Sequence, residues 1–556
     1  MTTQTLPHPG AQNLGGGRAQ FTLFAPRKKN VFLMGDFNDW QPARDRLAEI
    51  EEGCWALERE LTSGEHFYQF IVDGQTICDP CARRVKLLGD RSWREPVPQA
   101  IIDLGQSPFE WKHDHWQRPP FRDLILYELH TLDFSGAGTF TAVKDKLPYF
   151  RDLGINALEL MPVCETNRDE GWGYEPTYFF ACKGLFGAEA ELKTLIDEAH
   201  AQGIAIILDI VLSHTAGNHP FTYLYPYEAS PWYGEGIGGN NKFGLPTLDH
   251  RKPATQNFAR DVQHFWLEEY HIDGFRYDYA INIGIEQEKG LPTVVRQART
   301  LRPDAYLIGE YLPEDPQVAG LSELNATWHV YYSYALKALV RQKEVSGYSQ
   351  ENFEKSLEAI DPFKSGYLAP THMINYLESH DEQRLVYDLR LDGLEGYDAR
   401  LRVGLAATIL FTSPGVPMLY MGQEFGERTP RSINDRNPLC WELLATWGGK
   451  GLLEHFQKLI RIRQAHPALR ADSYIVDRVH DEQKWVVYHR WNNEGDEVLV
   501  AANFANEPRR IPVPFPSPGR WKDLIRGPII NIVRTGDIYE FEFQPFEAGI
   551  MVKTEL

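Results

Sequence analysis

The segment Gly274-Phe275-Arg276-Tyr277-Asp278 decides the fold of the central part of this chain, because it has the form of a short buried strand that ends in a carboxylate. Arg276 and Asp278 are two residues apart, so their side chains point to the same side of a strand. Three other segments have the same form, with an apolar run next to acidic residues or a histidine. They are DIVLSH at 209–214, IGE at 308–310 and ESHD at 378–381.

Around these segments, strand-like runs alternate with helical patterns. The segment 189–200 has apolar residues at helical spacing and ends before Gly203. Strands that alternate with helices predict a parallel sheet, and polar residues at the carboxyl ends of the strands predict a site on that face. We therefore predict the α/β fold class, with a (β/α)8 TIM barrel over residues 119–470. Its further strand-like runs are 124–129, 155–160, 204–208, 305–308 and 418–421.

Both flanks of the predicted barrel have different patterns. Residues 1–20 are rich in glycine, proline and glutamine, and we predict that they are flexible. Residues 21–110 are predicted to form an N-terminal β-sandwich, since the apolar run 66–72 precedes Asp73-Gly74, a hairpin signal. Residues 471–556 are predicted to form a C-terminal β-sandwich, a smaller all-β domain with strands at 485–489, 498–502 and 538–543.

The composition restricts the partners of the chain. Lys and Arg total 57 against 77 Asp and Glu, a net charge of −20, which argues against nucleic acid and anionic membranes as partners. The start of the chain lacks a basic segment followed by an apolar run, so we expect a cytoplasmic protein. Cys78 and Cys81 have no second pair or histidines nearby in sequence, which predicts a turn and no metal site. The oligomeric state stays open.

The carboxylates at the predicted strand ends match the needs of glycosidic bond cleavage with retention. That reaction needs a carboxylate nucleophile and a carboxylic acid about 5–5.5 Å apart, which two strand ends of a barrel can supply. We predict that Asp278 is the nucleophile and Glu310 the general acid/base, with Asp381 as the third catalytic carboxylate. Arg276 is predicted to keep Asp278 ionised and to orient it.

In this order, the four segments resemble the α-amylase superfamily of glycoside hydrolases and transglycosylases. Further segments resemble other motifs of that family, namely WGYEP at 172–176, LPTLD at 245–249 and GVPMLYMGQE at 415–424. The segment GDFNDW at 35–40 resembles the starch- and glycogen-associated β-sandwich of branching enzymes, isoamylases and maltooligosyl trehalose trehalohydrolases. The resemblance implies an α-glucan or malto-oligosaccharide substrate. The N-terminal sandwich either binds this glucan or only supports the barrel.

The resemblance also implies roles for residues around the nucleophile. The carboxylate that matches Asp381 grips two sugar hydroxyls, and the tyrosine that matches Tyr174 stacks on the sugar ring at the cleavage point. His214 and His380 match the histidines that hydrogen-bond the sugar in subsite −1, and Asp209 matches a structural or substrate-side carboxylate. The predicted substrate-binding residues of this group are Tyr174, Asp209, His214, Arg276 and His380.

A loop at 221–243 is rich in aromatic residues and glycine. Because sugar rings stack well on aromatic faces, we predict that this loop forms part of the glucan cleft, with Trp232 as a further substrate-binding residue. The alternative is a loop that packs on itself at the rim of the barrel.

Some positions depart from the commonest pattern of the family. Ser213 stands where an asparagine supports a calcium site in many amylases, so we predict no cofactor, with calcium as the less favoured alternative. Ser379 replaces the usual asparagine of the fourth motif, and serine at both positions resembles branching enzymes. Tyr279-Ala280 follows the nucleophile where many endo-amylases have Lys-His.

The predicted function is double-displacement hydrolysis of α-glucosidic bonds in malto-oligosaccharides or in glycogen- and starch-type glucans. The short spacing between Asp278 and Glu310 favours hydrolysis, since it resembles that of compact hydrolases. The first alternative is a 1,4-α-glucan branching enzyme, a transglycosylase that makes α-1,6 links, and the second is maltooligosyl trehalose trehalohydrolase. A glucan-binding protein without activity predicts the loss of Asp278, Glu310 or Arg276, and all three are present.

Overall fold

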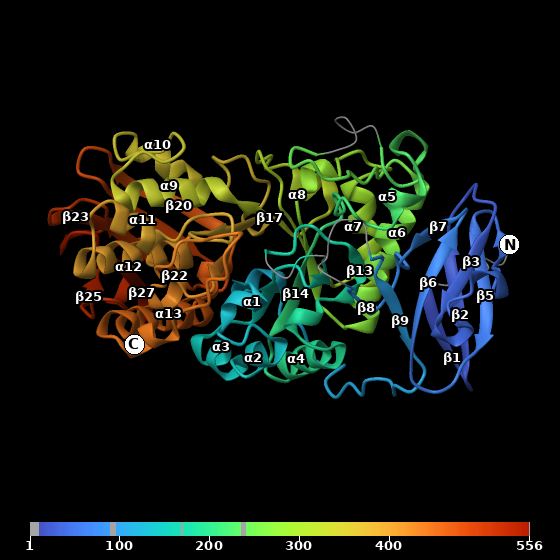
Figure 1. The fold of residues 1–556 in the computed structure, drawn as a ribbon. Coiled ribbons are helices and arrows are strands. Elements are labelled where there is room, and N and C mark those ends of the chain that lie inside the picture. The colour runs from blue at the N-terminus through green and yellow to red at the C-terminus, as the bar shows by residue number, and fades with distance from the viewer. Residues whose placement is uncertain (1–9, 89–95, 167, 169–170, 235–240, 555–556) are drawn as a thin grey trace.

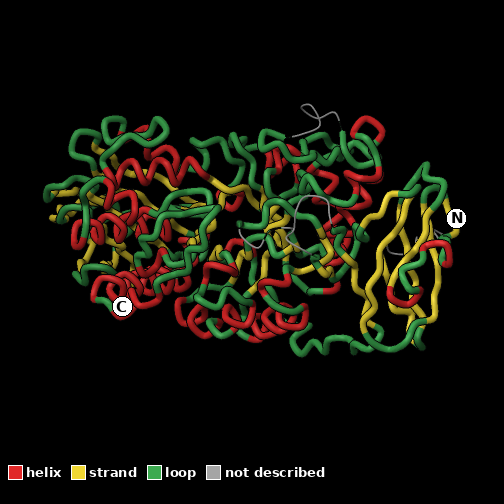
Figure 2. Tube along the Cα trace, viewed as in Figure 1, coloured by secondary structure: helices red, strands yellow, loops and turns green. Residues whose placement is uncertain are grey.

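The computed structural model describes residues 10–88, 96–166, 168, 171–234 and 241–554. The protein has N-terminal sheets at one end, a closed barrel in the middle and C-terminal sheets at the other end (Figure 1). The N-terminal end consists mainly of strands and loops, whereas helices and strands lie together in the rest of the molecule (Figure 2).

Eight parallel strands close into a barrel in chain order, and β10 pairs with β19 to complete it. This arrangement confirms the predicted (β/α)8 fold. Strand β17 (Ala326–His329) has no counterpart among the predicted strand-like runs. The other strands of the barrel are β10 (Leu126–Leu129), β11 (Ala157–Leu160), β14 (Ala205–Ile210), β15 (Gly274–Tyr277), β16 (Tyr306–Gly309), β18 (Met373–Tyr376) and β19 (Val416–Tyr420).

Helices connect the barrel strands and surround them. The predicted helix at 189–200 is α4 (Glu189–Ala201). Helix α13 (Trp447–Ala465) begins behind Thr446, whose hydroxyl accepts a hydrogen bond from the Gly449 amide at 3.0 Å and so caps the first turn. The remaining α-helices are α1 (Thr131–Phe134), α2 (Phe140–Lys144), α3 (Leu147–Leu153), α5 (Phe221–Leu224), α6 (Pro253–His264), α7 (Leu291–Leu301), α8 (Val318–Ser322), α9 (Val330–Arg341), α10 (Phe353–Leu357), α11 (Leu385–Leu391) and α12 (Gly396–Thr412).

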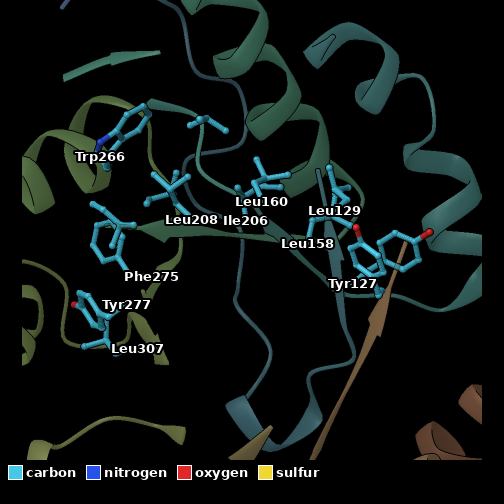
Figure 3. Packing of buried hydrophobic residues seen from close by; sticks show 14 of the residues in the cluster. Tyr127, Leu129, Leu158, Leu160, Ile206, Leu208, Trp266, Phe275, Tyr277 and Leu307 are labelled. Atoms are coloured by element: carbon cyan, nitrogen blue, oxygen red, sulfur yellow. The ribbon is translucent and has the colours of Figure 1, made fainter. Parts of the chain in front are cut away.

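The side chains of the barrel strands alternate between two hydrophobic clusters. Leu158 and Phe275 belong to the large cluster that the strands share with the surrounding helices (Figure 3). Leu126, Ala157 and Ile207 belong to a second cluster. Because successive residues of a strand face opposite sides of the sheet, this second cluster fills the interior of the barrel. Residues two positions further along each strand therefore also face the interior.

The N-terminal part is a sandwich of two sheets, β1-β2-β5-β4 and β3-β6-β9-β8, with β7 beside β6. Phe21 on β2 and Tyr68 on β6 meet edge to face, with ring centroids 4.9 Å apart, in the core between the sheets. The strands are β1 (Gly10–Gly15), β2 (Arg18–Phe24), β3 (Val31–Gly35), β4 (Ala48–Glu51), β5 (Cys54–Glu60), β6 (Glu65–Val72), β7 (Gln75–Ile77), β8 (Val85–Lys86) and β9 (Gln99–Asp103).

The prediction that residues 1–20 are flexible is wrong from Gly10 onward. Strands β1 and β2 pair antiparallel around Gly15, Gly16 and Gly17, which have φ values of 78°, 63° and 78°. The glycines that suggest flexibility in the sequence supply the positive φ that this tight connection requires. Residues 1–9 lie outside the described residues.

The C-terminal part also contains two sheets, β20-β21-β22-β27-β24-β25 and β23-β26, around a separate hydrophobic cluster. The strands predicted at 485–489, 498–502 and 538–543 correspond to β21 (Trp485–Trp491), β22 (Glu497–Asn503) and β26 (Ile538–Phe543). The other strands are β20 (Ser473–His480), β23 (Arg509–Pro514), β24 (Gly519–Asp523), β25 (Ile529–Ile532) and β27 (Ala548–Thr554). No helix in the described part of the chain has the length and apolar character to cross a membrane.

Candidate active site

Charged side chains lie inside the barrel near the carboxyl ends of its strands. Four charged residues come two positions after an inward-facing residue of their strand, and each is buried. They are Glu128 on β10, Glu159 on β11, Asp209 on β14 and Arg276 on β15. A buried charge costs free energy unless it is paired and hydrogen-bonded, so four of them in one barrel indicate a site rather than a packed core. Trp328 on β17 faces the same interior.

Arg276 is the centre of this cluster. Its Nη1 atom lies 2.9 Å from Asp209 Oδ2 and 2.8 Å from Asp278 Oδ1, and its Nη2 atom lies 3.1 Å from Glu310 Oε2. The guanidinium also lies 4.3 Å from the centroid of the Trp328 ring, which covers one of its faces. One fully buried cation therefore brings together the predicted nucleophile, the predicted acid/base and Asp209.

The backbone fixes the two predicted catalytic carboxylates where their strands end. The Asp278 amide donates to the Ile210 carbonyl at 3.0 Å, and the Glu310 amide donates to the Tyr277 carbonyl at 3.0 Å. Tyr279 adopts a left-handed conformation with φ 46°, and its amide donates to Glu310 Oε2 at 2.8 Å. Burial raises the pKa of the Asp278 carboxyl well above its usual range, Arg276 opposes this rise, and the charges of Glu310 and Asp209 add to it.

His380 lies between two carboxylates. Its Nδ1 atom is 2.5 Å from Glu128 Oε1, and its Nε2 atom is 3.4 Å from Asp381 Oδ2. Burial lowers the pKa of His380, but Asp381 and Glu128 together outweigh burial and raise it to about 9. The imidazole is therefore a cation at neutral pH. The Asp381 side chain is 44% exposed, so the third predicted carboxylate faces the solvent side of the cluster.

Tyr174 connects Asp209 with His214. The Tyr174 hydroxyl donates to Asp209 Oδ2 at 2.6 Å, and its ring stacks on His380 with centroids 4.9 Å apart. His214 Nε2 lies 2.9 Å from the Tyr174 carbonyl oxygen, and His214 Nδ1 lies 2.8 Å from Ser213 Oγ. Burial lowers the pKa of His214 to about 4, so this histidine is neutral. Protein groups thus contact both nitrogens of His214, and its direct bond to sugar remains a prediction.

Trp232 does not line this site, and its predicted role in substrate binding is wrong. The side chain is 2% exposed and stacks on Phe221 at a centroid distance of 3.6 Å. It also meets Phe24 of the N-terminal sandwich edge-on at 6.0 Å. The neighbouring Tyr225 donates its hydroxyl to the Pro26 carbonyl at 2.6 Å. The buried rings thus join the loop to the N-terminal sandwich. This agrees with the alternative prediction of a loop that is packed and does not line the cleft.

Several site residues were absent from the sequence prediction. Glu128 binds His380, and its signal was a lone charge within the apolar run 124–129. Trp328 had no signal, because the short segment of β17 lacks a clear strand pattern. Lys242 lies 4.8 Å from the ring centroid of Tyr279 and 4.9 Å from that of the exposed Phe243, and its charge acts on Asp381.

The described residues contain no group of three or more His, Cys, Asp or Glu side chains arranged to hold a metal ion. Cys78 and Cys81 flank the buried Asp79, whose Oδ2 accepts a hydrogen bond from the Tyr68 hydroxyl at 2.6 Å.

The model of the α-amylase catalytic domain matches residues 128–233 and 226–439, which together make up more than half of the chain. The chain belongs to the α-amylase family. It is thus an α-amylase-family glycosidase, and the Arg276 cluster lies within the matched catalytic domain. The glycogen recognition site of AMP-activated protein kinase matches residues 24–86, and the α-amylase C-terminal all-beta domain matches residues 475–534.

Similar proteins and a solved structure agree with this membership. Malto-oligosyltrehalose trehalohydrolase of Saccharolobus solfataricus is 27% identical over 441 residues, which cover 71% of this chain and 74% of that protein. The 1,4-alpha-glucan branching enzyme GlgB of Bacillus cytotoxicus is 25% identical over 536 residues, which cover 88% of this chain and 80% of that protein. A pullulanase of Anoxybacillus sp. LM18-11 complexed with maltotriose has the same fold, with a TM-score of 0.82 at 20% identity, and the match covers 98% of this chain and 85% of that one.

Proposed function

We propose that this α-amylase-family protein hydrolyses α-glucosidic bonds of glycogen-type glucans and malto-oligosaccharides with retention of configuration. The observation that carries the proposal is that the guanidinium of Arg276 binds Asp278 and Glu310 through its two terminal nitrogens. Carboxyl groups held in this way are neighbours, and a retaining site needs its two carboxyl groups about 5–5.5 Å apart.

In the first step, Glu310 donates a proton to the glycosidic oxygen while Asp278 attacks the anomeric carbon. The bond to the leaving sugar breaks, and a glycosyl ester with Asp278 forms. In the second step, the Glu310 carboxylate takes a proton from water, whose oxygen attacks the anomeric carbon and releases Asp278. Asp381 and Tyr174 are proposed to hold the sugar ring, because the Asp381 side chain is exposed at the cluster and the Tyr174 ring stacks on the neighbouring His380.

The match of residues 24–86 to a glycogen recognition site supports a glucan substrate, and the net charge of −20 favours a neutral polymer. We further propose a cytoplasmic location and a reaction without a cofactor. The Ser213 hydroxyl supports the latter proposal, because it binds His214 at the position where many amylases have a calcium-supporting asparagine. Activity that survives dialysis against EDTA would agree with it, and activity restored only by calcium would contradict it.

A branching transglycosylase is the second candidate. Branching enzymes of Bacillus cytotoxicus and Oceanobacillus iheyensis align with 88% and 95% of this chain, more than the trehalohydrolase does. In that case a glucan hydroxyl replaces water as the acceptor in the second step, and the roles of Asp278 and Glu310 are unchanged.

Incubation with amylose separates these candidates when iodine staining and reducing ends are followed together. Loss of stain with a large rise in reducing ends indicates hydrolysis. Loss of stain with few new reducing ends, and with α-1,6 links that a debranching enzyme releases, indicates branching. No change in either quantity, on amylose or on a trehalose-capped oligosaccharide, would overturn the proposal.

A further inference from the structure

A cavity of about 530 Å³ lies where helix α12 meets the C-terminal part of the chain. Tyr397, Asp398 and Arg402 of α12 form one wall, and Asn506 and the segment 544–547 form the other. Figure 1 shows α12 at the end of the molecule away from the N-terminal sheets. None of the predicted catalytic residues lines this cavity.

The polar lining of the cavity suits a neutral ligand with many hydroxyl groups. Asp398 and Glu547 supply carboxylates, whereas Asn506 and Gln544 supply amide groups that both donate and accept. Arg402 is held in place, since its Nη1 atom donates to the Val340 carbonyl and its guanidinium lies 3.8 Å from the Phe546 ring centroid. Pockets of about 300–1,000 Å³ with a few placed polar groups are typical of small-ligand sites.

Two exposed aromatic rings extend this surface beyond the cavity. Tyr397, at the rim, is 59% exposed, and Trp447, at the start of α13, is 73% exposed. The Arg400 guanidinium lies between them, 5.4 Å from the Tyr397 ring centroid and 3.8 Å from that of Trp447. Cation–π contact on one face holds a ring in place and leaves the other face to the solvent. Exposed rings that lie together beside polar residues are typical of a binding surface.

We propose that this α12 surface, made of Tyr397, Asp398, Arg400, Arg402, Trp447, Asn506, Gln544 and Glu547, is a second binding site for an α-glucan chain, separate from the active site. The cavity takes one or two sugar units through their hydroxyl groups, and the chain continues over Tyr397 and Trp447, which stack on the sugar rings. The carboxylates in the cavity disfavour an anionic polymer. The proposal rests on the proposed glucan substrate for its choice of ligand.

Such a site has a definite consequence for catalysis. A polymer bound at the α12 surface stays near the active site after each cleavage, so its next bond is met at a raised effective concentration. An oligosaccharide that is shorter than the path between the two sites gains nothing. The α12 surface therefore selects long glucans over short ones.

Affinity electrophoresis in gels that contain glycogen tests the proposal. The test uses Glu310→Gln as the background, so that the glycogen stays intact, and adds Tyr397→Ala or Trp447→Ala. We expect each added substitution to weaken the retardation by about five-fold, the size of one lost stacking contact. Tyr539→Ala is the matched control, because this tyrosine of β26 is 38% exposed and does not line the cavity. Retardation equal to that of this control, or no retardation of the background protein, would overturn the proposal.

A kinetic measurement separates failure of this proposal from failure of the proposed function. With Glu310 restored, we expect Tyr397→Ala to lower the ratio of kcat/KM on glycogen to kcat/KM on maltotriose by about five-fold. An active enzyme with an unchanged ratio contradicts the α12 surface alone. If the enzyme is inactive on every α-glucan but its retardation in the glycogen gel still depends on Tyr397, only the proposed function is contradicted. Trp447 is the first residue of α13, directly after the capping residue Thr446, so Trp447→Ala could destabilise the helix. If Trp447→Ala lowers the melting temperature, the results for Tyr397→Ala, in α12, are used to test the proposal.

Discussion

The strand ends of the barrel and the aromatic loop at 221–243 both carry side chains that the sequence assigns to sugar contacts, and the described residues of the two regions fold in opposite ways. At the strand ends, Asp278 and Glu310 converge on the guanidinium of Arg276. In the loop, Trp232 turns inward, stacks on Phe221 and reaches the N-terminal sandwich.

The contrast has a simple physical basis. A charge inside a barrel loses its hydration, so it is stable there only with partners, and a cluster of such charges is retained for what it does. An aromatic ring gains free energy when it is buried, so the same ring suits a core as well as a cleft. Charged residues at strand ends are thus more specific signs of an active site than aromatic residues in a loop.

The sharpest test of this contrast on the charged side is Glu310→Gln. Loss of the proton donor is expected to lower kcat on amylose by about 10²- to 10⁴-fold, while the melting temperature changes little because glutamine keeps the size of the side chain. The measurement is the rate of release of reducing ends, with thermal unfolding followed by circular dichroism. An unchanged rate would remove Glu310 from the mechanism.

On the aromatic side, Trp232→Ala is expected to reverse this pattern. Truncation of a buried tryptophan leaves a cavity and should lower the free energy of unfolding by about 3–5 kcal/mol. The rate on amylose at low temperature should stay close to that of the wild type. Phe243→Ala is the control, because this ring is exposed and near Tyr279, so it should affect the rate more than the stability. A Trp232→Ala protein with normal stability and a lost rate would restore its predicted role in the cleft.

The pH dependence of stability examines the charged cluster further. The pKa of His380 is raised to about 9 from an ordinary value of 6.5, so its stabilising contribution is complete below pH 6.5 and is lost as the pH rises through about 9. The contribution is at most about 3 kcal/mol. The deficit of His380→Gln in unfolding free energy should therefore be largest near pH 6 and should shrink towards pH 10. A deficit that does not vary with pH would show that His380 is neutral between Glu128 and Asp381.

The smallest expected effect concerns two glutamates that lie side by side in the barrel, Glu128 on β10 and Glu159 on β11. Burial raises the pKa of Glu159 well above its usual range, Glu128 adds to the rise, and neither Glu159 oxygen has a hydrogen-bond partner among the described residues. A raised folded-state pKa lowers stability above the ordinary carboxyl pKa of about 4.5.

Glu159→Gln should therefore raise the unfolding free energy at pH 7 by about 1 kcal/mol, and this gain should vanish near pH 4. Glu128→Gln should do the reverse at pH 7, because it removes the partner of His380. Chemical denaturation at both pH values provides the measurement. Equal changes in unfolding free energy for the two substitutions would contradict this difference between Glu128 and Glu159.

Much of the fold could be predicted because it is written in local patterns. The alternation of strands and helices predicted the barrel, and period-two runs predicted β21, β22 and β26. The strand β17 could not be predicted, since Thr327 and His329 interrupt Ala326–His329 and leave no apolar run there. The hairpin of β1 and β2 could not be predicted either. The pairing of the two strands stabilises it, whereas the glycines at its turn suggest disorder when they are read alone.

The sequence by itself determined the predicted chemistry of the site, because Arg276, Asp278, Glu310 and Asp381 lie within short motifs whose order and spacing follow the strands. The tertiary structure alone decided which side chains share that site. It joined Glu128 to His380 across the closure of the barrel, placed Trp328 against Arg276 and buried Trp232 away from them. The reason is physical. Residue type fixes what a side chain can do, whereas the long-range packing that closes a barrel fixes what it meets.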